Sequence, residues 1–332
     1  MAETAGATAP RTTTGDILPA LPLESWRPTK ETLHRYAQII GKVALAKGIR
    51  RNHWWHMTYR LTARGWTTVP LGSAADGPVF TCEFDFFDHV LRLSNDHGTQ
   101  EEIPLGGQSV ASFYLETMNG LRNLGVDVTL AHPTPFDLPD HGRPFDEDEQ
   151  HHHYDPVLAQ RAFRVQSQVG RILEQFSASY SGKISPVQLF WHTFDLSVQR
   201  FSNRKIDMTD AVDPVTREAY SREDISAGFW FGDDKIPEPT FYAYTAPEPA
   251  GLTARPLRPD AARWVPSGSG HNAYLAYDVP RTSADPVGTV LDFFESAYRA
   301  GATLAGWDGP ALACQGGITD PVLWTPHVGW PE

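Results

Sequence analysis

The chain has 332 residues, of which 41% are hydrophobic, 11% aromatic and 20% charged, a globular composition that excludes disorder for most of its length. Its formal net charge of −12 argues against binding to a nucleic-acid backbone or to an anionic membrane surface. The two cysteines, Cys82 and Cys314, lie far apart and indicate neither a disulfide framework nor a zinc site. We therefore expect a cytoplasmic protein whose ligand is small or neutral.

The first half is predicted to begin with a disordered tail over residues 1–22, which are rich in Ala, Thr and Pro and contain no long apolar run. A helix is predicted over 30–46, where apolar residues recur at helical spacing after Thr29. Residues 52–62 alternate between apolar and polar side chains, as in a half-buried strand. The other elements expected here are strands 80–86 and 90–93, helix 109–124 and a short strand 126–130.

The second half follows a segment rich in proline and acidic residues, 132–153, which we interpret as a linker. Asp155 before Pro156 is typical of a helix start. The elements expected after it are helix 156–180, strands 187–198, 225–231, 241–244 and 274–277, and helix 286–304. A proline- and glycine-rich insertion at 247–272 is long enough to cover a cleft. Residues 311–332 form a C-terminal extension.

The two halves share a faint internal similarity. Residues 54–63 match 189–198 at a constant offset, which places Thr58 on Thr193. Residues 110–125 resemble 290–306, and the matched segments keep the same order. We therefore predict two fused repeats, 23–131 and 154–310, related by a pseudo-twofold axis with a cleft where equivalent faces meet. The alternative is that two amphipathic strands and two amphipathic helices look alike by chance.

The predicted fold class is α+β. Many of the expected strands follow one another as hairpins, which is typical of antiparallel rather than parallel pairing. We therefore expect largely antiparallel sheets with the helices packed on one face.

Ten short segments together resemble a bacterial domain-of-unknown-function family over most of the chain. They are NHWWH at 52–56, TARG at 62–65, YDP at 154–156, GKISPV at 182–187, FW at 190–191, FDL at 194–196, RFS at 200–202, REAYS at 217–221, SAGFW at 226–230 and FYAY at 241–244. The resemblance implies no established reaction. It also implies histidines where this chain has Gln188 and Arg222, and a glycine in place of His192. These departures favour altered chemistry, a specialised substrate or a non-catalytic role.

The tract from His151 to His153 is a candidate metal site. Three consecutive histidines cannot all point at one ion, and a usable site needs three or four ligands from fixed elements. The sequence favours the alternative that Tyr154 and Asp155 cap the helix that follows. We therefore expect neither a metal nor a cofactor.

The polar side of the predicted strand 52–62 is the main candidate for a catalytic site. It carries His56, Thr58 and Arg60, whose repeat equivalents are Trp191, Thr193 and Asp195. If the two polar sides line one interface, Arg60 and Asp195 meet across the axis. The alternative is that this side is simply the solvated face of a sheet.

Further carboxylates and cations complete the predicted site. Glu83 and Asp85, on the polar side of a neighbouring strand, would add acceptors to the same region, and the candidate bases are His56, Asp85 and Asp195. Arg60, with Lys183 or Arg200, would hold an anionic group. The aromatic side chains of Trp230, Tyr242 and Tyr244 are candidates for a binding wall, although such residues are more often core.

The motifs of nucleotide, serine-hydrolase, kinase and zincin chemistry are missing from the sequence. By elimination, the leading hypothesis is a cofactor-free enzyme of specialised metabolism that catalyses an elimination, isomerisation or intramolecular cyclisation on a small polar metabolite. The alternatives are a non-catalytic binding or scaffold subunit of a hetero-complex, and a metalloenzyme. The candidate metal ligands of such a metalloenzyme are His53, His56, His89, His151 to His153 and His192. A homodimer and a second protein subunit both remain open.

Overall fold

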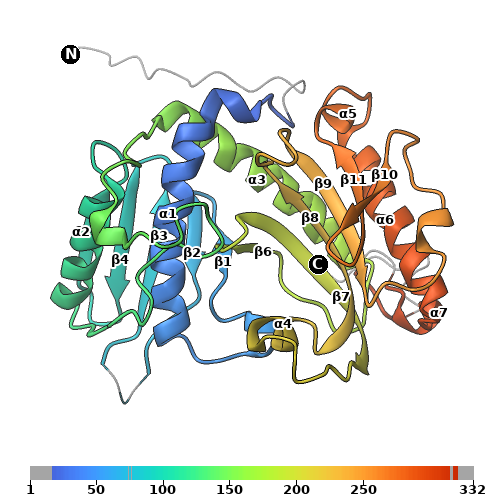
Figure 1. Ribbon diagram of the computed structural model, residues 1–332, viewed down its shortest axis with the longest axis horizontal. Coiled ribbons are helices and arrows are strands. Elements are labelled where there is room, and N and C mark those ends of the chain that lie inside the picture. Colours follow the sequence, from blue (N-terminus) through green and yellow to red (C-terminus); the bar gives the residue numbers. More distant parts are fainter. Residues whose placement is uncertain (1–16, 74, 76, 315–316, 321–332) are drawn as a thin grey trace, which may run out of the picture.

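The computed structural model describes residues 17–73, 75, 77–314 and 317–320 (Figure 1). This part of the chain contains seven α-helices: α1 (Leu23–Lys47), α2 (Val110–Asn123), α3 (Pro156–Ala178), α4 (Pro214–Ala219), α5 (Asp278–Arg281), α6 (Pro286–Leu304) and α7 (Gly309–Leu312). Its 3-10 helices are η1 (Asn52–Trp54), η2 (Phe145–Glu147) and η3 (Leu252–Ala254). None of the described helices is both long and apolar enough to cross a membrane.

The strands of the described residues form one sheet. They are β1 (Tyr59–Leu61), β2 (Gly65–Thr68), β3 (Phe80–Asp85), β4 (Val90–Asn95), β5 (Gln100–Pro104), β6 (Gln188–Phe190), β7 (Asp195–Lys205), β8 (Arg222–Trp230), β9 (Thr240–Ala246), β10 (Arg263–Ser267) and β11 (Gly270–Ala276). Their order is β10-β11-β9-β8-β7-β6-β1-β2-β3-β4-β5, and every neighbouring pair is antiparallel. The fold is therefore α+β with an antiparallel sheet, as predicted.

The four longest helices pack against the same face of this sheet. The hydroxyl of Tyr59 on β1 donates to a carbonyl of α1 at 2.6 Å, and α3 passes so close to β1 that a Cβ on Gly170 would lie 2.7 Å from the Leu61 side chain. Further aromatic contacts join α2 to β3 and α6 to β9. Apolar side chains of the strands alternate toward these helices, so the core lies on this side.

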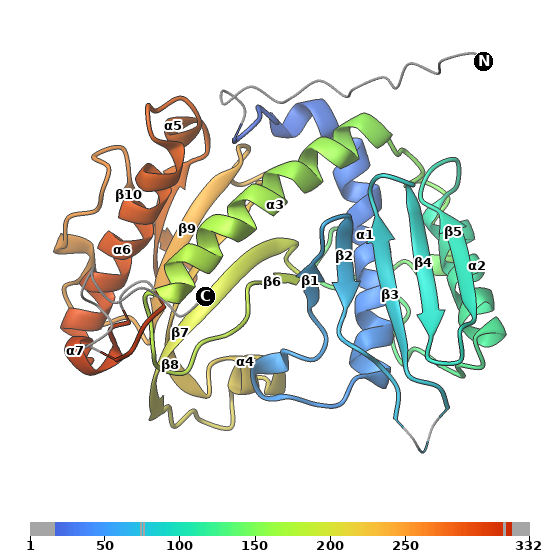
Figure 2. The same cartoon turned by 180° about the vertical axis from the view of Figure 1, so that it is seen from behind.

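The sheet twists strongly along its length. Neighbouring strands of a sheet rotate on average by roughly 20–25°, so a sheet of eleven strands accumulates more than half a turn. As a result α1 lies in front of the sheet in Figure 1, whereas α3 lies behind it and comes to the front in Figure 2. The helix-free face of β6 to β9 therefore opens toward the viewer of Figure 1, beside α1.

The helix predictions are confirmed where local capping signals were present. The Asp155 side chain accepts the backbone N–H groups of Val157 and Leu158 at 2.9 and 3.0 Å, at the start of α3. Helices α2 and α6 also lie where they were expected. By contrast α1 begins earlier than predicted, and Leu18 and Leu21 are buried, so the end of the predicted tail belongs to the core. The first 16 residues of the predicted tail, and most of the predicted C-terminal extension, lie outside the described residues.

We expect Asp155→Ala to lower the free energy of unfolding by about 1 kcal/mol, because two backbone donors of a buried helix lose their acceptor. Asp213 is the matched control, since it caps α4 in the same way but α4 has no buried residues. Urea denaturation of Asp155→Ala and Asp213→Ala checks the difference. Equal losses would show that the cap of α3 is not coupled to the core.

Two strand predictions are wrong. Residues 52–62 form η1, a turn and only then β1, and residues 187–198 form β6, a turn and the start of β7. The chain cannot remain extended there because His53, Trp54 and Phe194 have left-handed φ values of 55°, 62° and 59°. The short strand at 126–130 is also not formed, while β2, β5 and β10 were not predicted.

The predicted linker and insertion both pack on the fold. The 247–272 insertion contributes β10 to the edge of the sheet, and its Arg258 N–H donates to Ser296 of α6 at 3.0 Å. It therefore extends the sheet at the end remote from β1 and β6.

Candidate functional site

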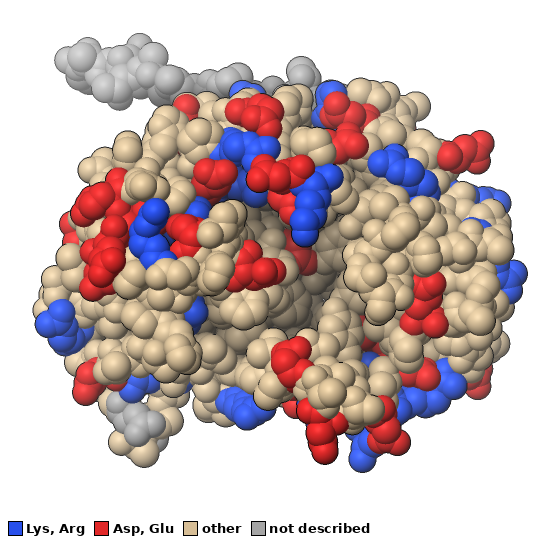
Figure 3. Space-filling model, in the orientation of Figure 1, with Lys and Arg blue, Asp and Glu red and all other residues tan. Residues whose placement is uncertain are grey.

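Figure 3 shows a hollow over β6, β7 and β8, between α1 and the strands β9 and β11, with acidic side chains at its rim and inside it. It opens onto the helix-free face of the sheet. We call the residues that these strands present there the polar face: Gln188, Asp195, Ser197, Gln199, Asp224, Ser226, Gly228, Tyr242 and Tyr244.

Strand register aligns the polar face in rows. Gln188 pairs with Ser197, Ser197 with Gly228, and Gly228 with Tyr242. A second row joins Gln199, Ser226 and Tyr244. Because side chains alternate along a strand, the intervening apolar residues of β6 to β9 point to the helices. The sequence thus places polar groups on one side of four adjacent strands.

Gly228 makes room for the central contact of the polar face. A Cβ at this position would lie 2.5 Å from both Cζ and the hydroxyl oxygen of Tyr242, so the tyrosine ring passes over the glycine. Its hydroxyl donates to Oδ2 of Asp195, and the hydroxyl of Thr193 donates to Oδ1 of the same carboxylate. Asp195 is thereby held in one orientation while remaining partly exposed.

We expect Gly228→Ala to lower the free energy of unfolding by about 1–3 kcal/mol, because the added methyl group overlaps the Tyr242 ring and the Leu196 carbonyl oxygen. Gly270→Ala on β11 is the control, since its methyl group would meet only the flexible end of Glu248. Chemical denaturation of both variants checks the difference. A cost at Gly228 no larger than at Gly270 would contradict this packing.

Three tyrosines extend the site from Asp195. The Tyr242 and Tyr244 rings are stacked with centroids 6.2 Å apart and an interplanar angle of 6°, and the Tyr220 hydroxyl lies 3.2 Å from that of Tyr244. Burial is the main cause that raises the pKa of all three hydroxyls above the ordinary value. They are therefore neutral near pH 7 and can donate hydrogen bonds.

Several atoms of the polar face are buried without a partner among the described residues. They are Nε2 of Gln188, Oε1 of Gln199, both carboxyl oxygens of Asp224 and Oγ of Ser226. Burial raises the pKa of Asp224 well above its ordinary value. Unpaired buried polar atoms are rare and each costs about 1–3 kcal/mol, so a group of them on one face indicates a place for ligand or ordered water.

Thr58 and Arg60 lie beside the polar face. The Arg60 guanidinium donates to Thr58 Oγ1 at 2.7 Å and to Gln188 Oε1 at 3.2 Å, and Thr58 donates to the same Gln188 oxygen at 2.8 Å. The expected pairing of Arg60 with Asp195 is therefore replaced by a contact with Gln188.

His53 joins three of the segments noted in the sequence. Its Nδ1–H donates to the Ala219 carbonyl at 2.9 Å, which leaves Nε2 to accept from the Lys183 ammonium at 2.6 Å. Its backbone N–H donates to Glu218 at 2.9 Å. These bonds hold η1 against α4, which lie side by side in Figure 1. Lys183 also lies over the Trp55 and Phe201 rings, at 5.4 and 4.8 Å from their centroids.

Two of the three predicted bases lie elsewhere. His56 is buried, and its Nδ1 accepts the Arg51 backbone N–H at 3.2 Å. Asp85 is bound by Arg64 and Arg92, and although its burial acts to raise the pKa, these hydrogen bonds hold it well below the ordinary value. Since β3 is four strands away from β7, roughly 20 Å separates Asp85 from Asp195. The expectation that these carboxylates share one region is wrong.

The remaining predicted residues divide between the two faces. Trp230 is partly exposed on the helix-free side of β8, where its register partner on β7 is Asp195. Glu83 accepts from Thr62 at 2.9 Å, on β3. Trp191 packs against Gly41 of α1. Arg200 points to the helical side, where it pairs with Glu295 at 3.2 Å. Neither Trp191 nor Arg200 therefore faces the hollow.

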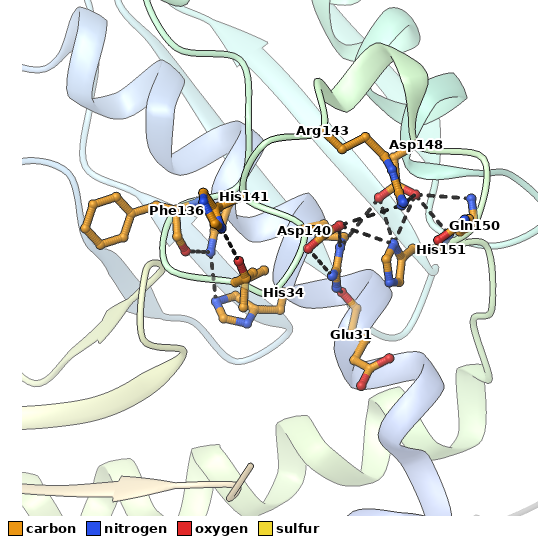
Figure 4. Close-up of polar contacts among 12 residues, drawn as sticks. Glu31, His34, Phe136, Asp140, His141, Arg143, Asp148, Gln150 and His151 are labelled. Atoms are coloured by element: carbon orange, nitrogen blue, oxygen red, sulfur yellow. Dashed lines mark hydrogen bonds and ion pairs between the residues drawn. The ribbon is translucent and has the colours of Figure 1, made fainter. Parts of the chain in front are cut away.

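The histidine tract contributes to a second polar cluster, shown in Figure 4. Nδ1 of His151 lies 2.8 Å from Asp148, and the ligand atoms of Asp140, Asp148 and His151 are close enough to share a metal ion. Two arginines already balance the two carboxylates, however, because Arg35 contacts Asp140 at 2.6 Å and Asp148 at 3.5 Å, and Arg143 contacts Asp148 at 3.4 Å. The cluster therefore ties the 132–153 segment to α1.

The chain was compared with protein families, curated proteins and solved structures. A family model described as "Family of unknown function (DUF5996)" matches residues 18–314. The chain belongs to this family. The match confirms the resemblance seen in the short sequence segments. Comparison with curated proteins and with solved structures finds no match to the chain.

Several residues of the site in this DUF5996 chain were missed from the sequence. Gln199, Asp224 and Ser226 belong to no catalytic motif, whereas Tyr220 lies within the REAYS segment at 217–221 that was noted in the sequence. The signal that was available is the alternation of polar residues within otherwise apolar strands, at 197 and 199 on β7 and at 224 and 226 on β8.

Proposed function

We propose that this DUF5996 chain is a cofactor-free enzyme that performs an acid–base reaction on a small polar metabolite bound at the polar face. The observation that carries the proposal is Asp195, a partly exposed carboxylate fixed by two hydroxyls beside buried polar atoms that lack partners. The reaction class that fits is an elimination, an isomerisation or an intramolecular cyclisation, since each begins with removal of a proton.

In this proposal Asp195 is the general base. Its carboxylate takes a proton from a substrate carbon, while Thr193 and Tyr242 keep its orientation. Asp195 then gives the proton to another substrate atom in an isomerisation or cyclisation, or to the departing group or solvent in an elimination. The Tyr220 and Tyr244 hydroxyls are neutral and share one hydrogen bond, so the hydroxyl that accepts this bond keeps its own proton free to donate to the negative charge that develops on the substrate. Gln188, Gln199 and Ser226 provide further hydrogen bonds to its polar groups.

We further propose that the sheet arose from two repeats related by a pseudo-twofold axis. The central pair β1–β6 is antiparallel, and β2, β3 and β4 follow outward on one side as β7, β8 and β9 do on the other. Each series comes after a long helix, α1 or α3, and before another, α2 or α6. This correspondence pairs β1 with β6, whereas the sequence offset pairs β1 with the start of β7.

The test is a search for proton exchange. Pools of small polar metabolites are incubated with untagged protein in D2O, and proton NMR detects both conversion and the loss of individual C–H signals. We expect one compound to exchange or react with wild-type protein and not with Gly228→Ala, in which Tyr242 is displaced. A folded wild-type protein that binds a metabolite without exchange or conversion would instead favour the binding-subunit alternative.

A further inference from the structure

Buried carboxyl groups elsewhere in this fold are paired with arginine. Within the described residues, the buried acidic side chains are Asp85, Asp148 and Asp224. Asp85 is bound by Arg64 and by Arg92 at 3.1 Å, and Asp148 is bound by two arginines and a histidine. Asp224 is fully buried, and neither of its oxygens has a partner. Such pairing is the usual condition for burying a carboxylate, so the exception at Asp224 needs a cause.

The basic side chains around the polar face are engaged in other contacts. Arg60 donates to Thr58 and Gln188, and the Lys183 ammonium donates to His53. Arg222, two residues before Asp224 on β8, donates to the Asn203 carbonyl at 2.8 Å. Asp195, the other carboxylate of the polar face, is bound by hydroxyl groups. Among the residues that the structure describes, no cation is bound to either of these two carboxyl groups.

The other groups of the site also suit a cation. Oε1 of Gln199 is a hydrogen-bond acceptor, and both Asp224 oxygens become acceptors once the carboxyl group is ionised, so a cation with N–H donors would supply partners for all three atoms. Burial is the largest cause that raises the pKa of the Tyr220 hydroxyl, and Asp224 and Asp195 act in the same direction, so both carboxyl groups lie near this hydroxyl. The stacked rings of Tyr242 and Tyr244 add aromatic surface, which attracts cations through the negative face of the ring.

We propose that the substrate carries a basic nitrogen group with N–H donors, an ammonium, amidinium or guanidinium, which binds at Asp224 within the tyrosines of the polar face. The cation replaces the proton of the buried carboxyl group, which leaves to solvent. This inference rests on the proposed function for the position of the site and adds the substrate class. It also replaces the sequence-based expectation of an anionic group held by Arg60 with Lys183 or Arg200, because all three have other contacts.

The test compares two probes of nearly the same shape, n-butylguanidinium and n-butylurea, which differ in charge. Each is titrated into protein labelled with ¹³C-tyrosine, and the signals of Tyr220, Tyr242 and Tyr244 are assigned from single Tyr→Phe variants. We expect the cation to bind at least about tenfold more tightly than the urea, because a charge-assisted hydrogen bond is worth more than a neutral one. The shifts should be largest at these three tyrosines.

Two variants test whether Asp224 and Asp195 cause the preference for n-butylguanidinium over n-butylurea. Asp224→Asn, which keeps the shape of the neutral carboxyl group, is expected to remove the preference for the cation, and Asp195→Asn to reduce it. Glu116→Gln on the exposed surface of α2 removes the same charge elsewhere and should leave it unchanged. Equal affinity for the two probes, the absence of shifts for both at millimolar concentration, or a preference that survives in Asp224→Asn would overturn the inference. The acid–base proposal would still stand if the D2O search finds a substrate without a basic nitrogen.

Discussion

Asparagine in place of Asp195 is expected to lower the rate of substrate proton exchange by at least about 100-fold, because a positioned general base typically contributes a factor of 10² to 10⁴. The amide keeps the size of the side chain and can still accept one of the hydroxyl bonds from Thr193 and Tyr242. It cannot take up a proton at pH 7. The effect should therefore appear in kcat, with little change in the free energy of unfolding.

Two further variants separate the base from its supports. Thr193→Val removes one hydroxyl that orients Asp195 and should lower the rate less than the loss of the carboxylate itself. Glu116→Gln on α2 should have no effect. The measurement is deuterium incorporation by NMR at saturating substrate. An Asp195→Asn variant that folds and exchanges at the wild-type rate would exclude Asp195 as the base.

Acid is expected to destabilise the fold through His34, a buried ring of α1. His34 Nε2 lies 3.0 Å from the Trp191 carbonyl, and its ring stacks on Phe194. Burial, together with the charges of Lys30 and Arg35, lowers the pKa of His34 from the ordinary 6.5 to about 3. As the pH falls below 6.5, the unfolded chain takes up a proton that the folded chain does not. Stability is therefore complete above 6.5 and falls by about 1.4 kcal/mol for each pH unit until the pH reaches the folded pKa.

The His34→Gln variant separates the acid-induced loss of stability due to His34 from that due to other groups. Glutamine retains a donor for the Trp191 carbonyl but does not titrate. Between pH 7 and pH 5, the wild-type protein should lose about 2 kcal/mol more stability than the variant. His97→Gln, at an exposed histidine, should behave as wild type. Urea denaturation at the two pH values checks this, and equal losses for wild type and His34→Gln would contradict it.

The parts of the fold that follow from local chemistry could be predicted. Asp155 before Pro156, and Ser109 at the start of α2, are capping residues whose effect reaches only a few positions, and the helices begin there. The boundaries of the central strands could not be predicted, because His53, Trp54 and Phe194 adopt left-handed φ values that side chains other than glycine rarely take. Nothing in their residue types indicates such a conformation.

Some residues of the site could be predicted from the sequence, but the way the fold brings them together could not. Thr193 and Asp195 were found as the repeat equivalents of Thr58 and Arg60, and Tyr242 and Tyr244 were found as aromatic candidates for a binding wall. Their separation from Asp85 depends on strand order, which is set by pairing between residues far apart in the chain, above all Tyr59 with Leu189. The contact between Tyr242 and Asp195 depends on the ring crossing Gly228, a packing detail with no signal in the sequence.

The central claim is that the polar face binds a ligand, and a high-resolution crystal structure of the untagged protein tests it most directly. We predict non-protein density, from a small molecule or from ordered water, within hydrogen-bond distance of Gln199 Oε1, Ser226 Oγ and the Asp224 carboxyl group. Side chains that instead pair with one another and fill the space beneath Tyr220 and Tyr244 would contradict the claim.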